Sequence, residues 1–528
     1  MAEMQEFNNL GTVQPRPVMS IVENQRQWQW VNNNDFYRLI PAPYYSFYNN
    51  WVRLWLYWYD GYVPWVHGTA NGLLSTSIGT MIVNRSADSV FGGNIMFANA
   101  RKPLVYTENN GKRIGKALDF ISNDWTNKVD LKSKIKTAIR NAFAGGFSIL
   151  KLNVHEGNLW VDSLRADRFY IAKTGVGNIK KCVSILSFYD HITPDNKQGK
   201  KYALVEERRY EKIGMFEEEI PVVEYKMYDS STPIQYFSTS KDNFVDWKQL
   251  PKCVKEAFKD EYSFELNKPQ ALNGFKDLGV YLLKGSDDIS NVPQLGLGES
   301  LLASILNYLY EFDFYNTCFN TDMYLSRGRV MVPKYMQGPG AQAGQGNQNI
   351  GLDSFMYAKY DSPNPDATKP EAIQFELRSA EWKEARNILL ESIATNIGIS
   401  VSTLASYLND GSNRTAREVS AEESATTLFI ENNRRRFEAP INELLQGVLR
   451  FYGYIDDVEI RWSRAGMTNQ TVLVDNLTKA VNSGLISQKK AHDQYNYDDD
   501  EEQNAEDYAL VEKEKAQQQN SIFGGGEF

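Results

Sequence analysis

Gly338 to Gly351 is the part of the sequence that comes nearest to a phosphate-binding loop, because it is rich in glycine. In an ATPase such a loop ends in Lys and Ser or Thr at the start of a helix, where backbone N–H groups and the lysine hold the phosphates. This segment, GPGAQAGQGNQNIG, contains neither the lysine nor a helix start. It also has almost no apolar residues with which to build a core, so we predict a mobile loop in preference to a nucleotide site.

A run of acidic residues, Asp498 to Glu502, offers the carboxylates that a metal-dependent nuclease places around a divalent ion. Contiguous carboxylates repel one another and normally remain solvated, so we favour a solvated segment here. The histidines do not indicate a metal site either, because no two of them have metal-ligand spacing on a helix. The four are His67, His155, His191 and His492.

Patterns that could supply a nucleophile are missing as well. The sequence has no Gly-x-Ser-x-Gly elbow, which would present a reactive serine. The cysteines are odd in number and far apart, which argues against a disulfide framework and a thiolate metal site and favours folding in a reducing cytoplasm. They are Cys182, Cys253 and Cys318. We therefore expect a protein that is not an enzyme and that uses no cofactor and no metal.

Composition indicates a folded protein with several subdomains. The chain has 528 residues, of which 42% are hydrophobic, and this length corresponds to about three to four domains. Its formal net charge of -9 and its pI near 5.3 argue against a protein that adheres to nucleic acid, since neutralising phosphates needs clustered Lys and Arg.

Neither export nor membrane insertion is expected. Residues Met1 to Asn9 are polar and acidic, unlike a secretory signal. The most apolar neighbourhood, Leu39 to Val66, is interrupted by prolines and charged residues, and so it does not reach the ~20 consecutive apolar residues of a membrane span.

The elements that organise the chain lie between Gly296 and Tyr452. A helix is expected to begin near Gly298 to Ser300. Its apolar face would hold Leu302, Ile305, Leu309 and Phe312, and its polar face Asn307, Glu311 and Asp313. Residues 329–333 and 355–360 are typical of short strands. A second helix is expected from Ser379, which would cap it, with Trp382, Ala385, Leu389 and Ile393 on its apolar face.

A much longer helix follows these two. The polar turn cluster Asn409 to Ser412 closes the preceding loop, and Thr415 and Glu418 fit a capping box at the helix start. The apolar positions stay roughly periodic up to the stop at Tyr452, and they are Val419, Leu428, Phe437, Ile441, Leu444, Leu445, Val448 and Phe451. Pro440 is expected to kink the helix, because it removes one backbone hydrogen bond.

Helices and hairpins are expected in the rest of the chain. We predict helices over 73–90, 130–143, 468–481 and from a Ser487 cap to about 495, hairpins over 102–114, 148–161 and 202–228, a strand at 458–462, and an irregular insertion over 241–276. The segment Trp28 to Trp65 is crowded with Trp and Tyr. Such rings either fill a core or face a subunit interface, and a base- or carbohydrate-stacking platform is a third reading.

The order of elements from Gly296 to Tyr452 resembles that of the portal, or connector, proteins of tailed bacteriophages. In that family a helix enters a stem, a small clip follows, a helix returns, and a tunnel loop leads into a long wing helix. Gly146 to Tyr170 is similar to the family's wing strand pair, and Val481 to His492 to the segment after its last helix. The resemblance covers most of the chain, and the order of the motifs carries it.

The resemblance implies an α+β phage portal fold, with an α/β wing, a two-helix stem, a small clip, a long wing helix with a tunnel loop, and a helical C-terminal crown. The implied division is an N-terminal arm (1–25), wing (26–295), stem helix (296–325), clip (326–378), return stem helix (379–397), tunnel loop (398–414), long wing helix (415–453), crown (454–497) and acidic flexible tail (498–528).

The resemblance also implies a function and partners. The protein would form a homo-oligomeric ring, usually of twelve subunits, at one vertex of the viral capsid, and it would be assembled in the host cytoplasm into the virion. Scaffolding protein and major capsid protein would join it during head assembly, the terminase large subunit would dock transiently during packaging, and head-tail adaptor proteins would bind afterwards. Double-stranded DNA would pass through the channel non-specifically, and no membrane would be involved.

By position, the resemblance assigns two sets of residues. Asn409, Asn413 and Arg414 in the tunnel loop would contact DNA phosphates without reading sequence, although Asn413 could instead only cap the long helix. Arg327, Arg329 and Lys334 in the clip would dock the terminase or an adaptor. Two alternatives stay open: another non-enzymatic virion protein, such as an adaptor or minor capsid protein, and a cytoplasmic enzyme with an unrecognised site.

Overall fold

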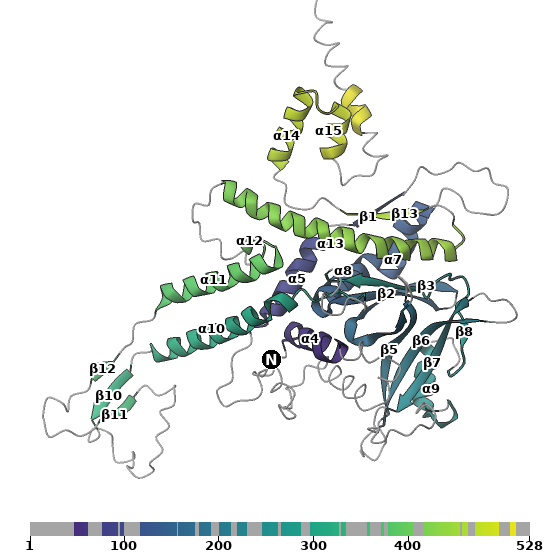
Figure 1. Cartoon of the computed structure of the whole chain (residues 1–528), viewed down its shortest axis with the longest axis horizontal. Coiled ribbons are helices and arrows are strands. Elements are labelled where there is room, and N and C mark those ends of the chain that lie inside the picture. Colours follow the sequence, from purple (N-terminus) through teal and green to yellow (C-terminus); the bar gives the residue numbers. More distant parts are fainter. Residues whose placement is uncertain are drawn as a thin grey trace, which may run out of the picture.

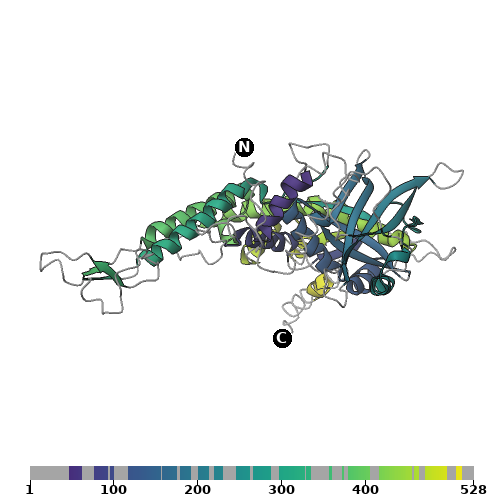
Figure 2. The same cartoon turned by 90° about the horizontal axis from the view of Figure 1, so that it is seen from below.

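The computed structural model confirms the α+β class (Figure 1). A body of sheets and helices carries one projecting helix pair and a separate group of C-terminal helices (Figures 1 and 2). The structure describes residues 47–61, 76–92, 95–99, 117–155, 157–174, 179–191, 200–212, 219–229, 245, 247–261, 266–286, 296–326, 329–333, 356–359, 371–373, 378–404, 416–454, 457–462, 470–495 and 507–513. The predicted hairpin over 102–114 lies outside these ranges.

Helix α8 (Leu131–Gly145) lies at the centre of the main core. Its apolar residues recur every four positions, as predicted, and Leu131, Ile135, Ile139 and Phe143 are all fully buried. They pack against an antiparallel sheet of order β3-β2-β9. Its strands are β2 (Phe147–His155), β3 (Asn158–Arg165) and β9 (Val280–Lys284).

A second antiparallel sheet has the order β4-β5-β6-β7-β8. Its strands are β4 (Phe169–Thr174), β5 (Ile179–His191), β6 (Lys200–Lys212), β7 (Glu219–Asp229) and β8 (Gln270–Ala271). The hairpin predicted over 202–228 is confirmed as β6 and β7, whose register runs from Tyr202 opposite Asp229 to Lys212 opposite Glu219.

The expectation of an irregular insertion over 241–276 is wrong for much of that segment. A 3-10 turn, η6 (Trp247–Gln249), leads into helix α9 (Lys252–Glu261). Val254 and Phe258, one helical turn apart on α9, are buried against the five-stranded sheet, where they form a second, smaller core. The segment therefore extends the body.

A group of buried charges links the two sheets. On β6, Glu206 accepts hydrogen bonds from Lys151 Nζ of β2 at 3.1 Å and from Arg208 Nε at 2.7 Å. Arg208 also donates to the Leu278 carbonyl at 2.7 Å and to Asn153 Oδ1 at 2.8 Å. Burial acts to raise the pKa of Glu206, but the two cations outweigh it and the pKa is lowered. The carboxylate therefore stays ionised between its partners.

The described part of the aromatic N-terminal region belongs to the core. It forms the π-helical turn η2 (Tyr48–Val52) and helix α4 (Arg53–Tyr59). Trp55 and Trp58 are buried, and Tyr48 packs edge-on against Tyr170 of β4 with ring centroids 4.9 Å apart. Of the readings offered for this region, core filling is confirmed for these residues.

Shorter elements surround this core. Helix α5 (Ile78–Phe91) begins later than the predicted helix over 73–90. The others are α6 (Ala117–Asp119), the π-helical η4 (Phe120–Trp125), α7 (Thr126–Val129) and the 3-10 turn η5 (Ala166–Arg168).

Helix α13 (Ala416–Phe451) is the longest element, and Pro440 lies inside it without ending it. Its residues Phe437, Ile441, Leu444, Leu445 and Val448 are fully buried. Leu428, predicted on the apolar face, is exposed instead. The proposed capping residue Thr415 lies outside the described ranges.

Strand β1 (Ile95–Asn99) pairs antiparallel with β13 (Val458–Trp462), which confirms the strand predicted at 458–462. Arg434 of α13 donates from Nε to the Val90 carbonyl at 2.8 Å and lies over the Trp462 ring. These contacts join an early and a late part of the chain.

Helices α14 (Gln470–Asn482) and α15 (Gln488–Tyr495) follow. The predicted Ser487 cap is confirmed, because the Lys490 N–H donates to Ser487 Oγ at 3.2 Å. Of the helices within the described ranges, none combines the length and apolarity that a membrane span needs.

Candidate functional site: the projecting helix pair

Helices α10 (Leu306–Leu325) and α11 (Ser379–Ile397) lie side by side and extend together away from the body (Figures 1 and 2). A small sheet of order β11-β10-β12 lies at their far end. Its strands are β10 (Arg329–Pro333), β11 (Met356–Lys359) and β12 (Glu371–Ile373). The first two confirm the strands predicted at 329–333 and 355–360.

The first helix of the pair begins later than predicted. Helix α10 starts at Leu306 after a 3-10 turn, η8 (Ala303–Ile305), and not near Glu299. Ser300 does not cap it: its buried hydroxyl donates to the Phe143 carbonyl at 2.8 Å and accepts the Leu302 N–H at 3.1 Å, so it closes a turn ahead of the helix. The apolar face is confirmed nonetheless, since Leu302, Ile305, Leu309 and Phe312 are buried. Similarly, α11 has Arg378 at its N-cap, and Ser379 is its first helical residue.

Two glycines allow the segment before α10 to touch the body. A Cβ on Gly298 would lie 2.6 Å from the Gly146 carbonyl oxygen, and one on Gly146 would lie 2.7 Å from that of Gly298. The Gly146 carbonyl also accepts the Gly285 N–H at 2.7 Å. The base of the pair is therefore fixed to the ends of β2 and β9 by close backbone contact.

Asp313 is buried, although the sequence pattern places it on the polar face of α10. Its Oδ1 accepts hydrogen bonds from the Thr76 backbone N–H at 3.0 Å and from Thr76 Oγ1 at 2.7 Å. Periodicity missed this burial because the partner comes from a distant part of the chain. The bond ties α10 to the start of α5.

Further out, aromatic and charged side chains clamp the two helices together. The Trp382 indole Nε1 donates to Asp322 Oδ2 at 2.7 Å, and the Tyr315 hydroxyl donates to the Trp382 carbonyl. Phe319 meets the Trp382 ring edge-on, and Arg378 reaches Asp322 Oδ1 at 3.4 Å. The indole hydrogen bond, followed by the Arg378 charge, lowers the pKa of Asp322.

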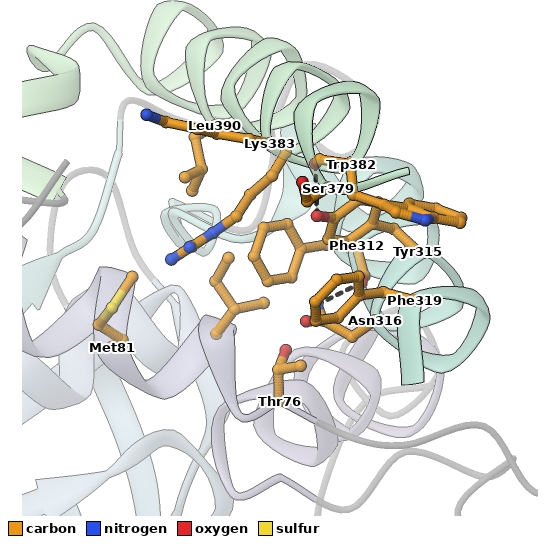
Figure 3. Close-up of a pocket in the computed structure, with 12 residues that line it drawn as sticks. Thr76, Met81, Phe312, Tyr315, Asn316, Phe319, Ser379, Trp382, Lys383 and Leu390 are labelled. Atoms are coloured by element: carbon orange, nitrogen blue, oxygen red, sulfur yellow. Dashed lines mark hydrogen bonds between the residues drawn. The ribbon is translucent and has the colours of Figure 1, made fainter. Parts of the chain in front are cut away.

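A pocket of about 410 Å³ lies between α10, α11 and the start of α5 (Figure 3). Aromatic rings and two cations dominate its wall. The lining residues are Thr76, Ile78, Met81, Phe312, Tyr315, Asn316, Phe319, Ser379, Trp382, Lys383, Arg386 and Leu390. None of these is a carboxylate, thiol or imidazole, so the wall lacks the side chains that commonly bind metal ions. Within the described ranges, no group of three or more His, Cys, Asp or Glu could hold a metal ion.

The outward faces of the pair are exposed and differ in chemistry. Helical spacing places Asn307, Tyr310, Phe314 and Thr321 on the side of α10 away from α11, and Glu381, Glu384, Ile388 and Glu391 on the opposite outer side of α11. Tyr310 is 45% exposed, Phe314 52% and Ile388 55%. Helix α10 contains no Lys or Arg. The cations Lys383 and Arg386 of α11 line the pocket. The outward faces therefore offer a polyanion little attraction.

The connection that leaves the pair is anchored to the body. Helix α11 ends at Ile397 and is followed by its C-cap, Gly398, whose φ of +82° favours glycine. The next residues form α12 (Val401–Leu404). The Ser400 backbone N–H donates to Thr426 Oγ1 of α13 at 2.9 Å, and Arg85 of α5 donates to the Thr403 carbonyl at 3.3 Å.

The structure does not test the two predicted residue sets. Asn409, Asn413, Arg414, Arg327 and Lys334 lie outside the described residues. Arg329 begins β10, where its backbone is opposite Ile373 of β12. Sequence reasoning missed the Trp382–Asp322 clamp and the exposed aromatic face of α10. The signal for that face was present, because Tyr310 and Phe314 lie one turn apart and opposite the predicted apolar face.

Comparison with known protein families gives one match. The model of the family described as "Phage portal protein, SPP1 Gp6-like" matches residues 67–520. No curated protein matches the chain. Solved structures that resemble it include two neck chains of low sequence identity. A chain of "Neck of empty GTA particle computed with C6 symmetry" is 12% identical with a TM-score of 0.43, over 84% of this chain and 93% of its own. A chain of "Neck of native GTA particle computed with C12 symmetry" is 13% identical with a TM-score of 0.39, over 79% and 89%.

Proposed function

This chain belongs to the SPP1 Gp6-like family of phage portal proteins, which are structural proteins and not enzymes, and from that premise we propose how it works. Copies of the chain form a closed ring at one vertex of a viral capsid. Double-stranded DNA enters through the ring during packaging and leaves through it at ejection. The motor that drives packaging is a separate ATPase, and this chain supplies the conduit.

The projecting helix pair is the observation that carries the proposal. A pair of antiparallel helices that lie side by side, fixed at its base through Gly298 and Asp313 and clamped farther out by Trp382, can be repeated around an axis as the wall of a channel. Helix α10 contains no Lys or Arg, and on α11 the two cations Lys383 and Arg386 are outnumbered by Glu381, Glu384 and Glu391. A wall of this kind does not bind phosphates strongly, which suits a polymer that has to slide.

The subdomains follow from this role. Residues 26–295 are the wing, 296–325 and 379–397 the two stem helices, and 326–378 the clip. Residues 398–414 are the tunnel loop, 415–453 the long wing helix and 454–497 the crown. An N-terminal arm (1–25) and an acidic tail (498–528) flank them. The compact body that contains α8 and both sheets supports the wing assignment, and the small sheet beyond α10 and α11 supports the clip.

Two residue sets have assigned roles in this proposal. Asn409, Asn413 and Arg414 contact the DNA backbone from the tunnel loop. Arg327, Arg329 and Lys334 form the clip surface on which the terminase large subunit docks transiently and to which a head-tail adaptor binds later. Scaffolding protein and major capsid protein contact the ring during head assembly. The protein is a component of the virion's portal vertex.

Native mass measurement of the purified full-length chain tests the proposal. We expect a closed ring of about twelve copies, visible as a perforated disc by electron microscopy. A monomer or dimer at micromolar concentration would overturn the proposal and favour the enzyme alternative. A ring of a different size that binds capsid components but no terminase would favour an adaptor.

A further inference from the structure

We propose that the outward face of α10 in one subunit packs on the outward face of α11 in the next subunit around the ring. The inference rests on the proposed function, because it requires a ring of identical chains. It adds which surfaces of the stem meet and in what register. Each of the two faces therefore binds another copy of this chain.

The α10 face has the character of a protein contact. Tyr310 and Phe314 lie one helical turn apart, and each ring is about half exposed on a helix that projects from the body. Ring surface of this size is favourable to bury, and adjacent exposed aromatic side chains are typical of interfaces. Within the described residues, the chain's own packing uses the other side of α10, where Phe312, Tyr315 and Phe319 face the pocket.

The two outward faces complement each other chemically. The α10 face combines aromatic rings with the Asn307 amide, which donates hydrogen bonds. The α11 face combines the aliphatic Ile388 with the carboxylates of Glu384 and Glu391, which accept them. Pairing α11 with α11 would oppose carboxylates to carboxylates. Pairing unlike faces reduces this repulsion, because the exposed side of α10 carries a single carboxylate, Glu311, beside Asn307. Contacts between different patches are those that close into rings.

The heights of the two faces along the pair also agree. The Tyr315 hydroxyl bonds the Trp382 carbonyl, which marks a common level on the antiparallel helices. At about 1.5 Å per residue, Tyr310 lies ~7.5 Å from that level toward the body and Ile388 lies ~9 Å from it in the same direction. By the same measure, Asn307 (~12 Å) is level with Glu391 (~13.5 Å). Where the pair runs along the ring axis, rotation about that axis preserves these heights, so side chains at equal heights can meet between neighbours.

A cysteine pair tests the contact in the full-length chain. Tyr310→Cys and Ile388→Cys are combined in one chain whose Cys253 and Cys318 are replaced by serine. Cys182 can stay, because burial raises the pKa of its thiol to about 12 and leaves it unreactive. Positions 310 and 388 lie on opposite outer sides of one helix pair, so a bond between them within a subunit is excluded. A mild oxidant should therefore yield a ladder of covalent oligomers on a denaturing gel.

Register is checked by a matched pair at the wrong height. Tyr310→Cys with Glu381→Cys uses the same two faces, but the positions differ by ~9 Å along the axis, and it should crosslink at least tenfold less. Native mass is measured on every variant before oxidation. If the ring forms but the 310–388 pair gives no ladder, the proposed contact is wrong. That result is expected if DNA or another protein covers these faces, and it leaves the proposed function standing. Failure of the unmodified chain to form any ring overturns the proposed function itself.

Discussion

The Trp382 indole on α11 donates a hydrogen bond to the Asp322 carboxylate on α10 across 2.7 Å. Asp322 lies near the C-terminal end of α10 and Trp382 near the N-terminal end of α11, and these two ends lie at the tip of the projecting pair (Figure 1). The spacing of α10 and α11 at this end depends on the contacts between the two helices. Trp382 supplies a donor and an aromatic surface, and Asp322 supplies the acceptor.

The clamp should weaken in acid. The pKa of Asp322 in the folded chain is lowered by the indole hydrogen bond and by Arg378. The contribution of the Asp322 carboxylate to the stability of the helix pair is therefore complete above its ordinary pKa of about 4. It is lost as the pH falls through the lowered pKa. Corrected for intrinsic rates, hydrogen exchange in the first turns of α11 should accelerate between pH 5 and pH 3. At pH 5, the Asp322→Asn variant should exchange faster than the unmodified chain, and its exchange should change little between pH 5 and pH 3. If the variant accelerates over this range as much as the unmodified chain does, Asp322 does not have this role.

Removing the charge of Glu206 should destabilise the body severely. Glu206→Gln leaves Lys151 and Arg208 buried with no anion between them, and breaking a buried ion pair in this way costs about 3–5 kcal/mol. The free energy of unfolding of the unassembled subunit in urea measures the loss. Glu256→Gln is the control, because its ion pair with Lys252 is exposed and should leave the midpoint unchanged. Equal effects of the two substitutions would refute the importance of the buried network.

The close backbone contact at the base of the pair predicts different costs for two neighbouring glycines. Gly298→Ala would press its Cβ against the Gly146 carbonyl oxygen and should cost about 1–3 kcal/mol or more through the forced backbone shift. Gly296→Ala meets nothing within 4 Å, and only its φ of +61° is unfavourable, at about 1–2 kcal/mol. Urea unfolding compares them, and only Gly298→Ala should also reduce the yield of rings. If both variants form rings in normal yield, the backbone contact between Gly298 and Gly146 can widen without disturbing ring formation.

Thr76 should stabilise the base of α10 through its hydroxyl. Thr76→Val keeps the shape but removes the bond to the buried Asp313 carboxylate, at a cost of about 1–3 kcal/mol. Thr76→Ser keeps the hydroxyl and should lose much less. Thermal unfolding of the two variants separates the hydrogen bond from the packing of the methyl group. If the serine variant is no more stable than the valine variant, the bond to Asp313 does not contribute.

Elements whose packing is local were predictable from sequence. The four-residue spacing of Leu131, Ile135, Ile139 and Phe143 identified α8 because one helix face meets one sheet. The strand at 458–462 followed from alternation of its buried positions. The pair α10 and α11 was also predicted, with a helix start misplaced because Ser300 bonds to Phe143 in the body.

Features that depend on distant partners were not predictable. Lys151 and Glu206 look like surface residues in sequence, and only the meeting of two sheets buries them. Asp313 is buried by Thr76, more than two hundred positions away. Strand β5 was missed because residues such as Lys180 and Lys181 interrupt its apolar pattern. The hydrogen bond between Trp382 and Asp322 needs an antiparallel register that neither helix specifies alone.

The pairing of β1 with β13 determines how late in synthesis a new chain can complete its fold. Arg434 and Val90, which meet beside this pairing, are 344 positions apart, so at typical synthesis rates of about 5–20 residues per second the earlier segment waits roughly 20 to 70 s for its partner. Polypeptides released prematurely by the ribosome would lack that partner and keep an unfinished edge. Truncated translation products would therefore be excluded from the ring, where one defective subunit could obstruct the passage of the genome.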